Sequence, residues 1–288
     1  MTEEIIGGQA VMEGVMMLNK EKQAIAVRNP KGKIIVKKNK IKLPKSKIAN
    51  LPFIRGVVKL IFMMVIGMRA LNYSSSIALD EKEEEFKGWG MFLFMILSIA
   101  FALFLFKFLP LLITKFLVSK ITFLQTSNFL PNLIDGIVKI SIFILYIYLM
   151  GISKETKKIF EYHGAEHKTI RCKEANEKLT VKNVRKFSRF HPRCGTAFIF
   201  GVFLISIFIY TIIPFNSTTF LENLGLRILL LPVIMGISYE ILRISGKNDK
   251  NIFFKMITAP GLWMQKLTTK EPNDKQIEVG IKSLKAVM

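Results

Sequence analysis

Long stretches without charged residues dominate the pattern of hydrophobic and polar positions along the chain. Trp89 to Phe106 is an uncharged run of 18 residues, and Gly195 to Phe215 is one of 21. A helix needs about 20 mostly apolar residues to cross the hydrocarbon core of a membrane. Leu133 to Ile152 and Leu224 to Ile244 are also long enough, although both contain charged residues. The pattern therefore predicts a mainly α, polytopic membrane helical bundle with about four spans.

A few charged side chains fall within the two weaker spans. Asp135 and Lys139 lie near the start of the second span, where we expect them to snorkel toward the headgroups. Arg227, Glu240 and Arg243 lie near the ends of the fourth. The other two spans contain almost no polar residues, so the sequence indicates no ion path, and transport is the weakest functional hypothesis.

The positions of lysine and arginine predict the orientation, because cytoplasmic segments retain basic residues and translocated loops avoid them. Residues 1–88, 153–194 and 243–288 contain 16, 12 and 9 Lys and Arg residues, whereas 107–132 contain three and 214–225 contain none. We therefore expect a multi-pass protein of the cell inner (cytoplasmic) membrane with both termini in the cytoplasm. No basic segment followed by a small-residue cleavage site opens the chain, so we expect no cleaved signal peptide.

The amino-acid composition excludes several classes of protein but does not indicate a function. With 51% hydrophobic residues and two cysteines, the chain does not match a disordered, collagen-like or disulfide-scaffold protein. The net charge of +21 is explained by the orientation signal and by attraction to anionic lipid. We expect membrane lipid as a partner and no nucleic acid, and we leave open a partner in a membrane protein complex and the oligomeric state.

The segments between the spans form a small cytoplasmic α+β portion. Asn29-Pro30-Lys31-Gly32 separates two β-prone runs, which predicts a β-hairpin near the start of the chain. An amphipathic helix and then an acidic linker precede the first span, and the His/Cys loop described below separates the two pairs of spans. The resulting segments are 1–50, 51–88, 89–152, 153–194, 195–244 and 245–288.

Two amphipathic stretches could lie at the membrane interface. Pro52 to Leu71 places its cations, Arg55, Lys59 and Arg69, on one narrow stripe at helical spacing. Ile252 to Leu267 is a second apolar stretch with aromatic residues. For each, the alternative is a short helix packed on the cytoplasmic domain.

The residues with metal-binding or nucleophilic chemistry are concentrated in one predicted cytoplasmic loop. His163, His167, Cys172, His191 and Cys194 are all the histidines and cysteines of the chain, and they fall within 32 residues. Such crowding of nitrogen and sulfur side chains indicates a metal site or a nucleophile.

The first half of this cluster has the H-x-x-E-H spacing of inverzincin metalloproteases. On a helix, His163 and His167 lie one turn apart on one face and can bind Zn²⁺ or another divalent metal, while Glu166 can act as the catalytic base toward bound water. The alternative is a polar helix in which Glu166 pairs with a neighbouring lysine.

The second half, His191-Pro192-Arg193-Cys194, directly precedes the third span. Proline is favoured in the first turn of a helix, so Cys194 is expected at the start of that span, where the helix dipole favours a thiolate. A thiolate there suits a zinc ligand or a nucleophile. The alternative is a small buried hydrophobic residue, and a reducing cytoplasm argues against a disulfide with Cys172.

Two further carboxylates are candidates. Glu240 lies near the cytoplasmic end of the fourth span and could complete the metal site, with an ion pair to Arg243 as the alternative. Glu13 lies among three glycines in Gly7 to Met17, which suggests a tight turn or a close approach of the backbone.

Several motifs in order along the chain resemble those of the YqhQ-like bacterial membrane proteins. This resemblance implies a family of unknown function that is described as a predicted metal-dependent enzyme. The motifs are Gly7 to Met17, Arg69 to Tyr73, Tyr162 to Lys168, His191 to Thr196, Tyr239-Glu240, Ala259 to Trp263, Leu267 to Thr269 and Glu271-Pro272.

Two functional hypotheses follow. The first is a cytoplasm-facing zinc site made by His163 and His167 with one or more of His191, Cys194 and Glu240, which hydrolyses a membrane-proximal substrate if one coordination position is open. The same residues would form a structural metal site if four protein ligands close the shell. The second is a non-enzymatic membrane scaffold or partner-binding protein.

Overall fold

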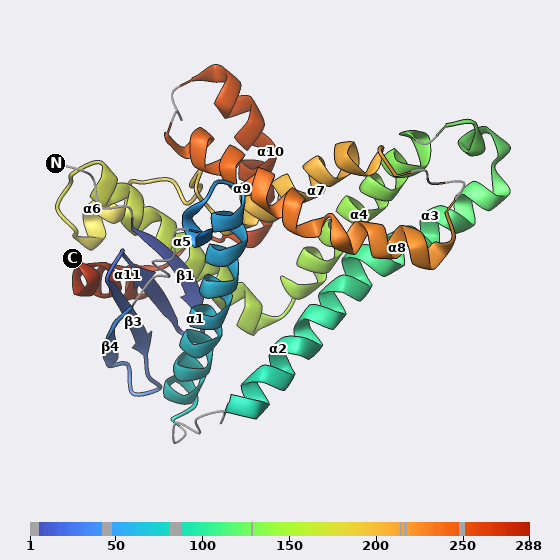
Figure 1. Cartoon of the computed structure of the whole chain (residues 1–288). Helices are drawn as coiled ribbons and strands as arrows, with labels where there is room; N and C mark the ends of the chain where they lie inside the picture. The colour runs from blue at the N-terminus through green and yellow to red at the C-terminus, as the bar shows by residue number, and fades with distance from the viewer. Residues whose placement is uncertain are drawn as a thin grey trace.

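The computed structural model describes residues 6–41, 48–80, 88–127, 129–213, 215, 218–247 and 251–288. The chain is mainly helical, with a small sheet and its covering helices at one end and long apolar helices at the other (Figure 1). Of the predicted acidic linker, only Asp80 lies within the described residues.

The sheet is an antiparallel meander in the order β1-β2-β3-β4. Its strands are Gly7–Val11, Gly14–Leu18, Lys22–Arg28 and Ile34–Lys40. The predicted hairpin is confirmed as β3 and β4, which pair antiparallel around the turn that contains Asn29. The sequence did not indicate the first two strands, because their glycines and central carboxylate obscure any strand pattern.

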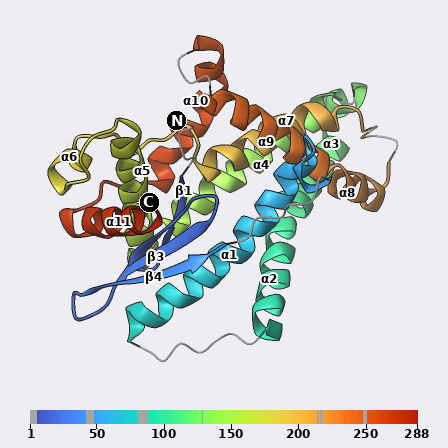
Figure 2. The same cartoon turned by 60° about the vertical axis from the view of Figure 1, so that its left-hand side comes forward.

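Helices cover both faces of the sheet. Successive side chains of a strand point to opposite faces, so both sets of side chains on the inner strands pack against helices. Ile25 and Val27 of β3 pack with Ile66 and Ala70 of α1, residues Ile54–Leu79. The opposite face packs against α5 (Lys154–Glu174) and α11 (Asp274–Val287). Figures 1 and 2 show this three-layer arrangement.

The second half of helix α1 therefore packs on the sheet, as in the alternative to a position at the membrane interface. Its first half is tied to α9 (Leu231–Lys247). Arg55 donates to the Glu240 carboxylate at 2.6 Å, and Lys59 donates to the Tyr239 hydroxyl at 3.0 Å. Two of the three cations in the predicted stripe thus bind protein groups.

Three helices in the described part of the chain are long and apolar enough to cross a membrane: Phe92–Lys120, Phe129–Met150 and Phe220–Ser245. The first contains most of α2 (Gly88–Leu103), a π-helical turn and all of α3 (Leu109–Lys120). It extends well beyond Phe106, where the sequence predicted the span to end.

The turn Phe104–Phe108 is π-helical and precedes Pro110. Proline cannot donate the hydrogen bond to the carbonyl four residues earlier, which is a common cause of such irregular turns. Figure 1 shows the first turns of α2 away from α4, and the side chains of α2, including Trp89 at 82% and Leu97 at 59%, are largely exposed. An apolar surface of this kind suits contact with lipid.

Helix α7 (Gly195–Tyr210) is shorter than the predicted span to Phe215. Its 16 residues extend about 24 Å, less than the ~30 Å hydrocarbon thickness. Ile213 and Phe215 are nevertheless buried beyond its end. The other two long apolar helices are α4 (Phe129–Met150) and the pair α8 (Phe220–Leu229) and α9, and α10 (Ile252–Thr268) packs beside α7.

A buried polar cluster joins these helices, and it overturns the expectation that Asp135 and Lys139 snorkel. Asp135 pairs with Arg227 of α8 and, at 3.0 Å, with Lys139; all three side chains are about 1% exposed. Lys107 of the π-helical turn, 5% exposed, donates to the Tyr210 hydroxyl at 2.5 Å. Charged groups at such positions hold helices together or perform a function. The uncharged runs of the sequence therefore did not reveal that charged groups are buried among these helices.

Short elements complete the chain. A 3-10 turn, Ile48–Asn50, precedes α1, and another, Thr122–Thr126, follows α3. Helix α6, Val181–Arg185, lies beside α11.

Candidate functional site

Helix α5 places His163 and His167 side by side. Ser153 caps its N-terminus by accepting a hydrogen bond from the Thr156 N–H at 3.2 Å, which stabilises the first turn. Residues four apart share one helix face, and the two imidazole rings lie with centroids 4.4 Å apart. His167 is buried and His163 is half-buried.

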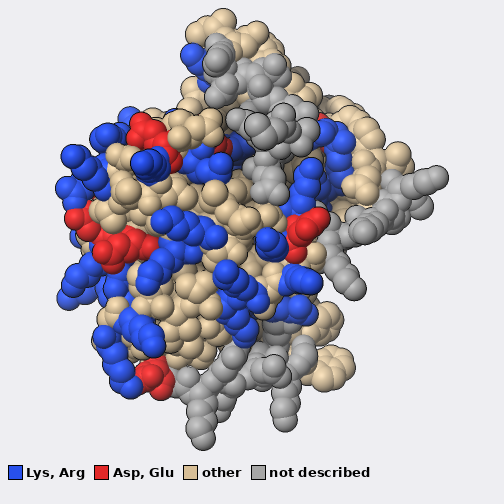
Figure 3. All heavy atoms as spheres, turned by 90° about the vertical axis from the view of Figure 1, so that its left-hand side faces the viewer, with Lys and Arg blue, Asp and Glu red and all other residues tan. Residues whose placement is uncertain are grey.

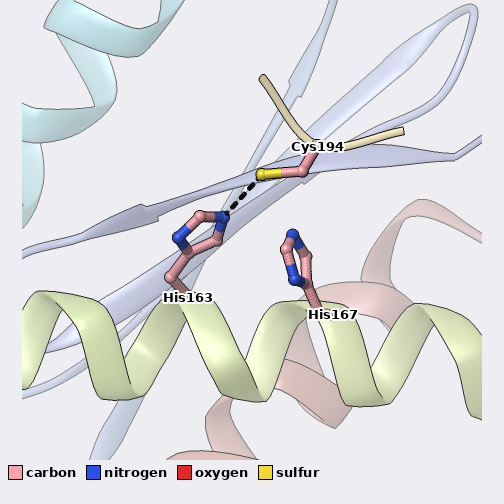
Figure 4. A group of neighbouring side chains, drawn as sticks. All are labelled: His163, His167 and Cys194. Carbon is pink, nitrogen blue, oxygen red and sulfur yellow. Dashed lines mark hydrogen bonds between the residues drawn. The ribbon is translucent and has the colours of Figure 1, made fainter. Parts of the chain in front are cut away.

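Cys194 joins the pair from a different segment. It is the residue immediately before the first residue of α7, and its Sγ lies 3.3 Å from His163 Nε2. One potential ligand atom from each of the three residues lies within 4.8 Å of the others. Figure 4 shows both rings projecting from α5 toward the sulfur. Tetrahedral zinc with these ligands has N···S separations of about 3.6 Å, so the residues fit a zinc ion after small side-chain adjustments.

Backbone carbonyls orient both rings. His163 Nδ1 lies 2.9 Å from the carbonyl oxygen of Thr268, and His167 Nδ1 lies 2.6 Å from that of Arg189. A carbonyl only accepts hydrogen bonds, so each Nδ1 carries the donated proton and each Nε2 is left for a ligand. Metal-binding histidines are usually held in this way.

The electrostatics favour an anionic sulfur. Burial raises the pKa of the Cys194 thiol, but the charges and hydrogen bonds of His163 and His167 outweigh burial and hold the pKa well below its usual range. Burial lowers the pKa of His163, yet the thiolate raises it to about 9. These shifts favour a thiolate at Cys194 and a protonated ring at His163, and a metal bound at Nε2 would displace that ring proton.

Glu166 lies between the two histidines in sequence and is 5% exposed. Its carboxylate accepts no hydrogen bond from the described part of the chain. A Cβ on Gly8 of β1 would lie 2.8 Å from Glu166 Oε1, so the glycine makes room for this side chain. Burial raises the pKa of the Glu166 carboxyl, and the neighbouring His167 and His163 oppose that rise.

Glu13 has a separate role. It lies at positive φ in the two-residue turn between β1 and β2. Its carboxylate accepts hydrogen bonds from Lys158 at 2.6 Å and from the Tyr162 hydroxyl at 3.2 Å. These contacts attach α5 to the sheet rather than adding a ligand.

His191 lies beside the group without belonging to it. Its ring centroid is 5.6 Å from that of His167. Both ring nitrogens are engaged: Nε2 lies 3.2 Å from a Glu174 carboxylate oxygen, and Nδ1 accepts the Arg193 N–H at 3.2 Å. Burial, together with the charges of His167 and Arg171, lowers the pKa of His191 to about 4. The predicted metal ligand His191 thus lies beside the group of His163, His167 and Cys194, with its ring nitrogens bonded to other residues.

Glu240 is not brought to the group. It pairs with Arg55 of α1 and lies 3.7 Å from Arg243, which corresponds to the ion-pair alternative for this residue with a second, unforeseen arginine. The first turn of α1 packs on this part of α9, since a Cβ on Gly56 would meet the Tyr239 side chain at 2.6 Å. Cys172 is also apart, buried beside Val184 and Ile277, with both cysteines unpaired.

Sequence reasoning missed Gln265 of α10. Its side chain is fully buried; the amide oxygen accepts the His191 N–H and the amide nitrogen donates to the His191 carbonyl, each at 2.8 Å. This two-bond contact positions the segment that carries Cys194. A buried glutamine within an otherwise apolar stretch was the available signal.

Gly164 offers a test of how closely α5 must approach the segment that supplies the Thr268 carbonyl. A Cβ there would overlap the Lys270 carbonyl oxygen, and backbone cannot move as a side chain can. We expect Gly164→Ala to reduce the free energy of unfolding by about 1–3 kcal/mol and to weaken metal binding. Thermal unfolding and metal analysis would measure both effects. Gly225→Ala, where nothing lies within 4 Å, is the helical control, and equal behaviour of the two variants would contradict this account.

Comparison with known proteins gives a family without an assigned activity. The family model "Protein of unknown function (DUF1385)" matches residues 51–288. The chain is 35% identical over 301 residues to "Uncharacterized protein YqhQ" of Bacillus subtilis (strain 168), covering 98% of this chain and 92% of that protein. No solved structure matches. The chain is thus similar to YqhQ of Bacillus subtilis and belongs to the DUF1385 family of proteins of unknown function.

Proposed function

We propose that this protein is a multi-pass inner-membrane metal-dependent hydrolase with a zinc site made by His163, His167 and Cys194. The observation that carries the proposal is that both histidines donate Nδ1–H to backbone carbonyls while their other faces converge on one sulfur. A pair of histidines that only packed together would not need this orientation.

The contacts of the remaining candidates support an open coordination position. His191 uses both ring nitrogens elsewhere, and Glu240 pairs with Arg55. Three protein ligands and a fourth position for water are the arrangement of catalytic zinc sites. Bound zinc would supply a water of lowered pKa and would polarise a carbonyl.

Glu166 is the proposed general base. It is buried beside the ligands, has no hydrogen-bond donor of its own in the described chain, and has room because residue 8 is glycine. In this role its carboxylate accepts the proton of the attacking water and passes it to the leaving group. The substrate is proposed to be an ester or amide near the membrane surface.

The placement in the membrane is part of the proposal. The three long apolar helices and the shorter α7 would make four crossings, and the distribution of lysine and arginine would place the metal site on the cytoplasmic side. Figure 3 shows lysine and arginine side chains spread over the α/β end, a surface suited to anionic headgroups. Exposed basic residues of this end include Lys182, Arg185, Lys275, Lys282 and Lys285.

Cobalt substitution tests the metal centre and its open position. The purified protein with Co²⁺ should show a sulfur-to-cobalt charge-transfer band that Cys194→Ser removes and Cys172→Ser retains. Added azide should alter the visible cobalt bands if a position is open. Absence of the charge-transfer band would overturn the site, and a spectrum insensitive to azide would identify a closed structural one.

Hydrolysis tests the role of Glu166. We expect the zinc-loaded protein to cleave a p-nitrophenyl acyl ester, and Glu166→Gln to reduce the rate by about 10²–10⁴-fold while retaining zinc. Glu161→Gln on the same helix is the control. Equal rates for Glu166→Gln and the wild type would contradict the proposed base, and metal binding without hydrolysis would favour the scaffold hypothesis.

A further inference from the structure

An apolar groove lies between α7, α9 and α10. It has a volume of about 270 Å³ and begins at Ala197, one helical turn after Cys194. Its walls combine small and aliphatic residues from all three helices: Ala197, Gly201, Leu204, Ile241, Ile257 and Gly261.

The dimensions of the groove suit a hydrocarbon chain. An apolar cavity of about 150 Å³ accommodates a benzene molecule, so the groove has room for a longer stretch of methylene groups. Gly201 keeps it open, because nothing lies within 4 Å of the position that its Cβ would occupy. Gly261 instead packs directly on Ala197, where an added Cβ would lie 2.6 Å from the alanine Cβ. The first glycine therefore provides space, and the second brings α10 close to α7.

One hydroxyl in the groove has no hydrogen-bond partner among the described residues. Ser245 is 1% exposed, and its Oγ forms no hydrogen bond within the described structure. The other two hydroxyls of the lining are satisfied by their own helices: Ser238 donates to the Ile234 carbonyl at 2.7 Å and Thr258 to that of Phe254 at 3.0 Å. An unpaired hydroxyl in an apolar wall loses free energy unless a ligand supplies an acceptor. An ester carbonyl would be such an acceptor.

Exposed apolar and basic residues lie close in sequence to the residues that line the groove. Met256 of the lining is 69% exposed, and Phe253 one turn earlier is 62% exposed, which suits contact with acyl chains. Arg243 precedes Ser245 by two residues, and the exposed Lys255 precedes Met256. Arg55 and Arg243 share the one carboxylate of Glu240, with Arg243 at 3.7 Å. Together with Lys255 these cations outnumber the acid, and the excess of positive charge suits an anionic headgroup.

We propose that the groove binds one acyl chain of an anionic phospholipid, with its ester carbonyl at Ser245 and its headgroup beside Arg243 and Lys255. The proposed binding of the acyl chain depends only on the groove and not on the metal site. That this lipid is also the substrate rests on the proposed function, and it identifies the substrate class as a lipid ester because the groove begins one turn from Cys194.

A photoactivatable phosphatidylglycerol with a diazirine in its acyl chain tests the site. The full-length protein would be reconstituted in phosphatidylcholine nanodiscs, illuminated, and mapped by peptide mass spectrometry. We expect labels on α7, α9 and α10. Gly201→Leu fills the groove and should reduce this labelling about tenfold, equivalent to about 1.4 kcal/mol of binding free energy. Gly225→Leu, a substitution into open space on α8, should leave it unchanged.

Further arms separate the alternatives. Ile257→Trp fills the groove from the opposite wall and should repeat the effect of Gly201→Leu. The matching phosphatidylcholine probe should label less, and equal labelling would overturn the anionic headgroup. Labels spread evenly over all spans, or unchanged by both filling variants, would overturn the groove. Zinc analysis of the same samples is independent: wild type without zinc contradicts the metal centre and leaves the lipid site standing, whereas zinc-loaded protein without groove labelling contradicts only the lipid site.

Discussion

Replacing both His163 and His167 by alanine is expected to abolish stoichiometric zinc binding. In the proposed site the two imidazoles are two of the three protein ligands. If each accounts for about a quarter of a zinc-binding free energy of ~12 kcal/mol, the double variant loses about 10⁴-fold or more in affinity. Metal analysis of protein purified in detergent and a competition titration against a chelator would measure the loss.

Single variants separate ligands from neighbours. Cys194→Ser should approach the loss caused by either histidine, because the oxygen of serine is a poor replacement for a thiolate. His191→Ala should cost at most about 10–100-fold, the range for residues outside the ligand set, and Cys172→Ala should cost nothing. Stoichiometric zinc in the His163→Ala/His167→Ala protein would refute the site, provided that the metal-free variant and metal-free wild type unfold at similar temperatures.

Asp135→Asn is expected to destabilise the helical part by about 3–5 kcal/mol, the cost of removing one partner from a buried ion pair. Its carboxylate pairs with Arg227 and Lys139, and all three side chains are about 1% exposed. Lys107 lies in the same cluster through Tyr210, whose hydroxyl donates to the Arg227 carbonyl at 3.1 Å. Removing the carboxylate therefore leaves buried cations without an acidic partner within the cluster.

Thermal unfolding followed by tryptophan emission would measure this effect. Asp274→Asn is the matched control, because Asp274 pairs with Arg185 on the surface, where both side chains are more than half exposed and such pairs contribute about 1 kcal/mol or less. Adding Lys139→Met to Asp135→Asn should restore part of the lost stability, because an apolar residue needs no counter-ion. Equal unfolding temperatures for the Asp135 and Asp274 variants would contradict the interpretation.

The polar cluster explains why the first span was predicted too short. Lys107 ends the uncharged run, so the sequence pattern indicated a membrane boundary there. In the structure the helix continues to Lys120 because Tyr210 of α7 binds the ammonium group inside the protein. A charged residue marks a helix end only when water, rather than another side chain, solvates it.

The strands of the sheet were difficult to recognise from the sequence for a different reason. Strands with one face in water alternate between polar and apolar residues, but β2 and β3 are covered on both faces by α1, α5 and α11. Their residues are therefore apolar almost without alternation, a pattern that short buried helices share. Only the turn residues around Asn29 distinguished the second hairpin.

The long apolar helices, the crowding of histidine and cysteine, and the placement of His163 and His167 on one helix face followed from the sequence, because they depend on hydrophobicity and local spacing. Tertiary structure decided that Cys194 joins this pair, that Glu240 pairs with Arg55, and that His191 lies outside the ligand group. The placement of His191 and His163 depends on Gln265 and the Thr268 carbonyl, more than 70 residues further along the chain, and Glu240 meets an arginine 185 residues before it. Contacts over such separations arise from packing of whole helices, which no local pattern encodes.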